Sequence, residues 1–97
     1  MSFIQIIECR TDRPDELFAL DKEWEAATEG KRTARSAVIT RDRDDPQRHM
    51  IIVTFDSYES AMQNSSLPET QEFAQKQAAV LTGAPVFYNL DVVDERL

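Results

Sequence analysis

The strongest constraint on the fold is the run Met50–Phe55, MIIVTF, in which every residue is apolar or β-branched. An unbroken run of this kind is typical of a strand that is covered on both faces, and such a strand lies in the interior of its sheet. A strand with only one buried face would instead alternate between apolar and polar residues. The sequence therefore predicts that this segment is a central strand.

A helix in two parts is predicted directly after that strand. Asp56 and Glu59 have the spacing of a capping box, which favours a helix start at this point. Pro68 then interrupts the helix, because its ring disfavours a helical conformation in the preceding residue. Ser66 and Glu69 repeat the capping spacing, so we expect the helix to restart there, with a buried stripe that comprises Phe73, Gln77, Val80 and Leu81.

Three further strands and one more helix complete the pattern. The segments 3–10 and 35–41 are predicted strands, the first central and the second at an edge, and 85–93 is the last strand. Between the first two, Asp12 can cap a helix with Pro14 in its first turn, and Gly30 ends it. Helical spacing gives this helix a buried stripe: Leu17, Leu20, Trp24 and Ala27.

The last strand offers two alternating sets of side chains, and we assign one set to each face. We expect Val86, Tyr88, Leu90 and Val92 to lie under the helices. The other set, which contains Phe87, Asn89 and Asp91, would then lie on the opposite face. This assignment decides which polar groups of the strand can reach a ligand.

The element order β-α-β-β-α-β predicts an α+β, ferredoxin-like domain over residues 1–97. Right-handed crossovers place both helices on one face of a four-stranded antiparallel sheet. The other face is apolar and has no cover from its own chain, and a patch of that kind is rarely left in water. We therefore expect a homodimer in which two sheets face each other around a cavity, as in a dimeric α/β barrel.

Composition excludes several classes of function. The formal charge is −7 and the pI is about 4.6, which argues against general nucleic-acid binding. The basic cluster Lys31, Arg32 and Arg35 is more simply a solvated loop. Cys9 is the only cysteine, so no internal disulfide forms, and its apolar setting favours an inert thiol. No secretory signal or membrane-length apolar run occurs, so we expect a cytoplasmic protein that does not bind membranes.

Few residues suggest chemistry on their own. His49 is the only histidine and could serve as a general base, although a half-exposed residue at a strand end is the simpler interpretation. The chain lacks the ligand spacing of a zinc or iron site, so we expect no metal. Trp24 lies on the helix stripe and is assigned to the core. Gln5, Asn89 and Asp91 could line the cavity between two sheets, or could simply form hydrogen bonds across the dimer interface.

The segment VTFDSYESAMQNSSLPETQEF resembles the antibiotic-biosynthesis-monooxygenase-like (ABM) domains of the dimeric α/β barrel superfamily, including a group of small actinobacterial proteins. The likeness covers nearly the whole chain and concerns fold motifs. Haem-degrading relatives carry an Asn on the first strand, then a Trp and a His in the second helical region. The corresponding positions here are Ile7, Asn64 and the neighbourhood of Ala74, and none keeps the residue type. The resemblance therefore implies that this chain does not degrade haem in the family's way.

The resemblance implies a cofactor-independent monooxygenase acting on an aromatic or polyketide-like molecule in the dimer cavity. Such a substrate supplies its own electrons to oxygen, and the protein supplies a dry cavity, orientation and a base. By residue type and position, His49, Asn64 and Tyr88 are the catalytic candidates, and the substrate-binding candidates are Gln5, Phe87, Asn89 and Asp91. No cofactor is expected. A non-catalytic ligand-binding dimer and a structural dimer with a filled cavity are the alternatives.

Overall fold

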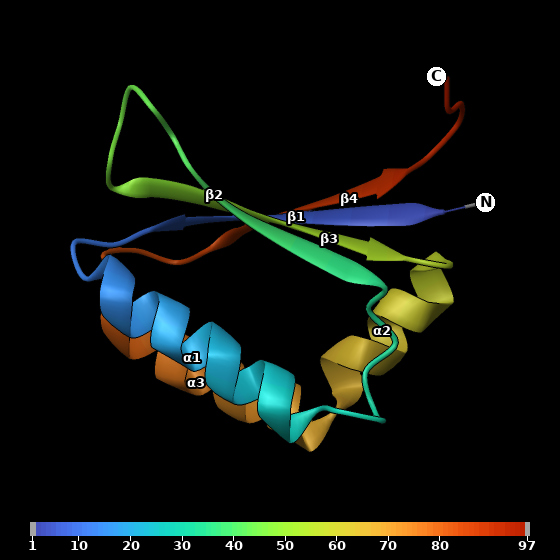
Figure 1. Cartoon of the computed structure of the whole chain (residues 1–97), viewed down its shortest axis with the longest axis horizontal. Helices are drawn as coiled ribbons and strands as arrows, with labels where there is room; N and C mark the ends of the chain where they lie inside the picture. The colour runs from blue at the N-terminus through green and yellow to red at the C-terminus, as the bar shows by residue number, and fades with distance from the viewer. Residues whose placement is uncertain (1, 97) are drawn as a thin grey trace.

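The computed structural model describes residues 2–96, which form one four-stranded sheet with the helices on one side (Figure 1). Seven elements occur, in the order predicted and with the second helix in two parts. Their bounds are β1 (Phe3–Arg10), α1 (Pro14–Ala27), β2 (Ser36–Arg41), β3 (Arg48–Phe55), α2 (Tyr58–Ser66), α3 (Pro68–Val80) and β4 (Val86–Asp91). The predicted α+β, ferredoxin-like architecture is confirmed.

The sheet is antiparallel throughout and has the strand order β2-β3-β1-β4. The apolar segments β1 and β3 are the two central strands, and β2 is an edge strand, as the sequence predicts. In the central pair Phe3 faces Phe55 and Cys9 faces His49. This register sets which side chains point toward the helices.

Burial on β3 alternates strictly, because one face of the strand lies under the helices. His49, Ile51, Val53 and Phe55 are buried, whereas the residues between them are only half-buried. The register carries this assignment of faces to β4, where Phe87 is paired with Ile7 and Asn89 with Gln5, although every residue of β4 is exposed. Phe87, Asn89 and Asp91 therefore share the helix side of the sheet.

Our assignment of the two faces of β4 was wrong. Val86, Tyr88 and Leu90 lie on the open face, opposite to the side predicted. Both alternating sets contain apolar residues, so the pattern within this strand did not decide between them. The pairing with β1 decides it.

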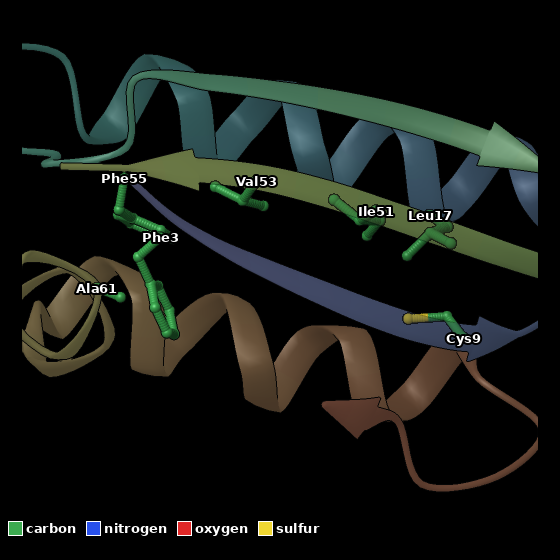
Figure 2. Packing of buried hydrophobic residues seen from close by; sticks show 7 residues of the cluster. All are labelled: Phe3, Cys9, Leu17, Ile51, Val53, Phe55 and Ala61. Atoms are coloured by element: carbon green, nitrogen blue, oxygen red, sulfur yellow. The ribbon is translucent and has the colours of Figure 1, made fainter. Parts of the chain in front are cut away.

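The buried core runs along the space between sheet and helices (Figure 2). At one end Phe3 and Phe55 pack with their rings 6.4 Å apart, next to Ala61 of α2. At the other end Leu17 of α1 and Cys9 are almost fully enclosed. Between these two ends Ile51 and Val53 of β3 continue the core, and their β1 partners there are Ile7 and Gln5.

The helix ends differ in detail from the predicted caps. Ser57, not Asp56, caps α2, since its side chain accepts a hydrogen bond from the backbone N–H of Ser60 at 3.0 Å. No side chain caps α3; Leu67 is its N-cap residue and Pro68 occupies the first turn, while the Ser66 hydroxyl donates back to the Met62 carbonyl. Both corrections concern one or two residues, and the break at Pro68 is confirmed.

The ends of α1 and α3 also differ from the prediction. The N-cap of α1 is Arg13 rather than Asp12, without a side-chain cap, and the Thr11 hydroxyl instead accepts from the Arg13 N–H. Gly30 lies three residues beyond the last residue of α1, in a turn with φ of 78° that glycine adopts without strain. Gly83 lies in the bend beyond α3, whose C-cap residue is Leu81.

The open face of the sheet is apolar over most of its area. The exposed large side chains include Val38 of β2 and the β4 residues Val86, Tyr88 and Leu90. Central-strand residues between them are half-buried although no helix covers them: Ile4, Ile6, Met50 and Ile52. Within residues 2–96, no helix is long and apolar enough to span a bilayer.

Candidate functional site

A cavity of about 460 Å³ lies between the sheet and the helices, within a single chain. Its floor is formed by central-strand residues, with Phe87 from β4 and Ala37 and Ile39 from β2. Its roof is formed by α1 and α3, and Asn64 and Ser65 of α2 line one side. The volume falls in the range of roughly 300–1,000 Å³ that is usual for small-molecule sites.

Aromatic rings form much of the roof. Trp24 and Phe73 lie with their centroids 6.4 Å apart, where α1 and α3 meet. The indole Nε1–H of Trp24 donates to the Thr70 hydroxyl at 2.9 Å, which fixes the ring plane. Trp24 therefore lines the cavity as well as packing between helices, and a flat apolar ligand would meet a rigid wall.

Gln5 and Asn64 are the two predicted site residues that bring amide groups to the cavity. The Gln5 Nε2 group donates to Asn89 Oδ1 at 3.1 Å, so Asn89 positions Gln5 from the neighbouring strand. The Asn64 Oδ1 atom accepts from the backbone N–H of Thr33 at 3.2 Å, which ties the segment before β2 to α2. Since that oxygen is engaged, Asn64 can offer a ligand its amide N–H groups.

Phe87 is also part of the lining, whereas Asp91 lies outside it. Asp91 pairs with Phe3 at the end of the sheet and is exposed. Of the four predicted substrate-binding residues, Gln5 and Phe87 thus line the cavity. Asn89 is outside the lining but forms a hydrogen bond with Gln5. Asp91 is not part of the lining.

Two of the three predicted catalytic residues lie away from the cavity. Tyr88 is on the open face, where its hydroxyl donates to Glu8 Oε1 at 3.1 Å. This contact and the Glu8–Arg48 ion pair lower the pKa of Glu8, with Arg48 the larger cause. His49 is fully buried rather than half-exposed: its Nδ1 lies 3.2 Å from the Gln47 carbonyl, and its ring meets the Phe18 ring edge-on at 5.8 Å.

Asp21 and Gln77 are cavity-lining polar residues that were not among the predicted site residues. Burial raises the pKa of the Asp21 carboxyl to about 6 from its usual value of 3.8. Gln77 is 4% exposed. A signal existed, because Asp21 is four residues after Leu17 and three before Trp24, and so occupies the buried stripe of α1. Polar residues on an apolar stripe are informative when buried.

Ion pairs hold the segment that borders the mouth of the cavity. Lys31 binds Glu69 of α3 at 2.9 Å, and Arg35 binds Asp56 at 2.5 Å. The Arg35 contact lowers the pKa of Asp56. The basic cluster of the sequence is therefore largely engaged with carboxylates, and Arg32, whose guanidinium donates to the Glu25 carbonyl at 2.8 Å, lines the same border.

The remaining titratable groups do not assemble into a metal site. Across residues 2–96, no group of three His, Cys, Asp or Glu side chains is placed to hold an ion. Cys9 is buried, and burial, followed by the nearby Asp21 and Glu8 carboxylates, raises the pKa of its thiol to about 11. Such a thiol is protonated at neutral pH and a poor nucleophile.

Solved structures share this fold over almost their full length. SnoaB from Streptomyces nogalater, described as a cofactor-independent oxygenase, matches with a TM-score of 0.82 and 12% identity, covering 97% of this chain and 95% of its own. The fold is theirs. A protein from Caulobacter crescentus provisionally described as an antibiotic biosynthesis monooxygenase has a TM-score of 0.84 and 12% identity, with 96% and 91% covered. Rv0793 from Mycobacterium tuberculosis gives 0.79 and 18%, with 98% of each chain covered.

These likenesses confirm at the level of fold the resemblance drawn from the sequence. No family model matches the sequence, and no curated protein does. The three positions at which the resemblance places haem-degrading residues, Ile7, Asn64 and Ala74, all line the cavity.

Proposed function

We propose that the chain binds a small, planar aromatic molecule in the cavity between sheet and helices and oxygenates it without a cofactor. The observation that carries this proposal is the cavity itself, which has apolar walls, a fixed indole and a few amide and carboxyl groups. Sites of this composition suit ligands with a flat apolar body and a few polar substituents. The fold shared with SnoaB supports the oxygenase part.

The proposed reaction takes all its electrons from the ligand. A CH₂ group activated by two flanking aromatic rings becomes C=O, while O₂ delivers one oxygen atom to that carbon and the other to water. The two hydrogens of the CH₂ group leave with the water, so atoms and electrons balance. The protein's part is to orient the ring against Trp24 and Phe73, to exclude water and to offer hydrogen bonds through Gln5 and Asn64.

This site differs from the one first expected between two sheets. Asn64, Gln5 and Phe87 remain candidates because they line the cavity. His49 and Tyr88 are not included, since neither lines it. Binding without turnover is the alternative function, and the same cavity would serve it.

Oxygen uptake with 1,8-dihydroxyanthrone, which carries a CH₂ group between two hydroxylated rings, tests the proposal. We expect the corresponding anthraquinone to form faster than in buffer, with one O₂ consumed per molecule, and with a metal chelator present. Ala74→Phe, which fills the cavity from α3, should abolish the effect. Ala78→Phe, on the same helix but outside the lining, is the matched control. Equal rates of anthraquinone formation in buffer, wild-type protein, Ala74→Phe and Ala78→Phe would refute the oxygenase proposal.

We also propose that two chains pair through the open sheet face. The apolar set on that face, together with its half-buried central strands, is large for a surface left in water. At one end of the face Arg48 is bound to both Glu8 and Asp42, which leaves no unpaired charge on that side chain to oppose burial. Sedimentation equilibrium should give twice the chain mass of 11.1 kDa.

A further inference from the structure

Two buried polar atoms in the roof of the cavity have no hydrogen-bond partner among residues 2–96: Asp21 Oδ2 on α1 and Gln77 Nε2 on α3. A buried polar atom left without a partner is destabilising, and native proteins rarely keep one without a reason. Gln77 is almost completely enclosed, and both residues line the cavity. His49 Nε2 is the third such atom, but it lies outside the lining.

The packing of α1 against α3 brings these two residues to the same level. The helices are antiparallel, since Trp24 binds Thr70 at one end of their contact and Arg13 binds the Ala79 carbonyl at the other. Between these points Glu23 binds Lys76 on the outer side. One turn before Trp24, on the inner side, lies Asp21; one turn after Phe73 lies Gln77.

The two atoms are chemically complementary to a single group. An ionised Asp21 oxygen accepts a hydrogen bond, and the Gln77 amide nitrogen donates one. A hydroxyl does both: its hydrogen can go to Asp21 while its oxygen accepts from Gln77. A ligand carbonyl could satisfy only Gln77, and an ether could satisfy only Gln77 as well.

We infer that Asp21 and Gln77 form a subsite for an acidic hydroxyl of the ligand, a phenol or an enol, in which Asp21 takes the hydroxyl proton and Gln77 stabilises the resulting oxyanion. This inference rests on the proposed function, because it assigns a substrate group to the same cavity. In the step, the ligand O–H bond breaks and an O–H bond forms on Asp21 Oδ2, so the proton is conserved and no oxidant is needed. The electron-rich anion that forms is the species that can pass electrons to O₂.

The surroundings of Asp21 suit a proton acceptor. Burial raises its pKa to about 6, which makes it a stronger base than an exposed carboxylate. Cys9 of β1, whose thiol is protonated, is close enough for the Asp21 carboxylate to raise its pKa. The neutral Gln77 of α3 lines the same cavity, and the charged residues Glu25, Arg32 and Arg35 border it. His49 of β3 lies beneath the neighbouring Phe18.

Calorimetric titration with two probes tests the subsite. The probes are 2-naphthol and 2-methoxynaphthalene, which share an aromatic body but differ in the hydroxyl hydrogen. At pH 7 we expect wild-type protein to bind the naphthol about tenfold more tightly, as a hydrogen bond to a charged group implies. Asp21→Asn should reduce that preference to about twofold or less, whereas Gln75→Met, on the exposed side of α3, should leave it intact. Gln77→Met should weaken the binding of both probes, because the ether oxygen of 2-methoxynaphthalene can also accept a hydrogen bond from the Gln77 amide.

The pH dependence adds a readout that a purely structural role would not move. The preference in wild-type protein should fall as the pH is lowered through about 6, and in Asp21→Asn it should be flat. An unchanged preference in Asp21→Asn, unchanged binding of both probes in Gln77→Met, or no binding of either probe to the wild-type protein would overturn the inference. A retained preference without oxygen uptake would instead overturn only the oxygenase proposal, so the two failures are distinguishable.

Discussion

Replacing Asp21 by Asn should make the protein more stable at neutral pH. The pKa of Asp21 is raised from 3.8 to about 6 by burial, so the folded state holds this proton more tightly than the unfolded state. A shift of about two units corresponds to roughly 3 kcal/mol. Because the residue is only partly enclosed, solvent screening reduces the expected effect to about 1–2 kcal/mol.

The sign of the pH dependence follows from linkage. Well below pH 3.8 the carboxyl is protonated in both states, so it does not affect the pH dependence of stability. Between pH 3.8 and about 6 the unfolded state releases the proton while the folded state retains it, so stability is lost over this range and changes no further above it. The difference between Asp21→Asn and wild type should therefore be near zero at pH 4 and reach its full size above pH 7.

Urea unfolding at half-unit steps from pH 4 to 8 would measure this difference. Other carboxyls with lowered pKa values, such as Asp42 and Asp56, are present in both proteins, so their contributions cancel in the comparison. A destabilised Asp21→Asn at pH 7, or a difference that does not change with pH, would show that the carboxylate has a stabilising partner and would refute the reasoning. Higher stability of Asp21→Asn at pH 7 would confirm that the wild-type protein carries a destabilising carboxylate in its cavity.

Three further outcomes are expected. Leu17→Ala, which removes a fully buried side chain of α1, should lower the free energy of unfolding measured in urea by about 2–5 kcal/mol. A loss below about 1 kcal/mol would mean that neighbouring side chains move to fill the cavity. Ser57→Ala should cost about 1 kcal/mol and Asp56→Ala less, since Ser57 makes the cap; the reverse order in thermal unfolding would contradict the observed cap. Ile52→Asp on the open face should yield monomers in sedimentation, while a persistent dimer would place the interface elsewhere.

The sequence predicts the fold well because its strongest signals are local. The apolar run of β3 and the break at Pro68 each follow from the chemistry of a few adjacent residues, and both appear in the structure. Caps were less predictable, since Asp56 and Ser57 are adjacent and either can cap a helix. The element order is then compatible with the ferredoxin-like topology, in which β1 and β3 are central strands and β2 and β4 are edge strands.

The candidate site was less predictable because it depends on register. The two faces of β4 carry similar amounts of apolar surface, so only its pairing with β1 assigns Phe87 to the cavity and Tyr88 to the open face. The burial of His49 likewise depends on Phe18 of a distant helix. Asp21 and Gln77 had a usable signal, a polar residue on a buried stripe, but only the packing of α1 on α3 brings them together.

The central claim is that a ligand binds within one chain, between sheet and helices, and Trp24 can test it directly. It is the only tryptophan in the chain and it lines the cavity, so its indole N–H gives a single reporter signal in a proton–nitrogen correlation spectrum. On titration with 2-naphthol we predict a saturating shift of this signal, lost in Ala74→Phe and kept in Ala78→Phe. An unshifted Trp24 signal, with chemical-shift changes confined to Ile52 and Leu90 on the open face, would contradict binding between sheet and helices.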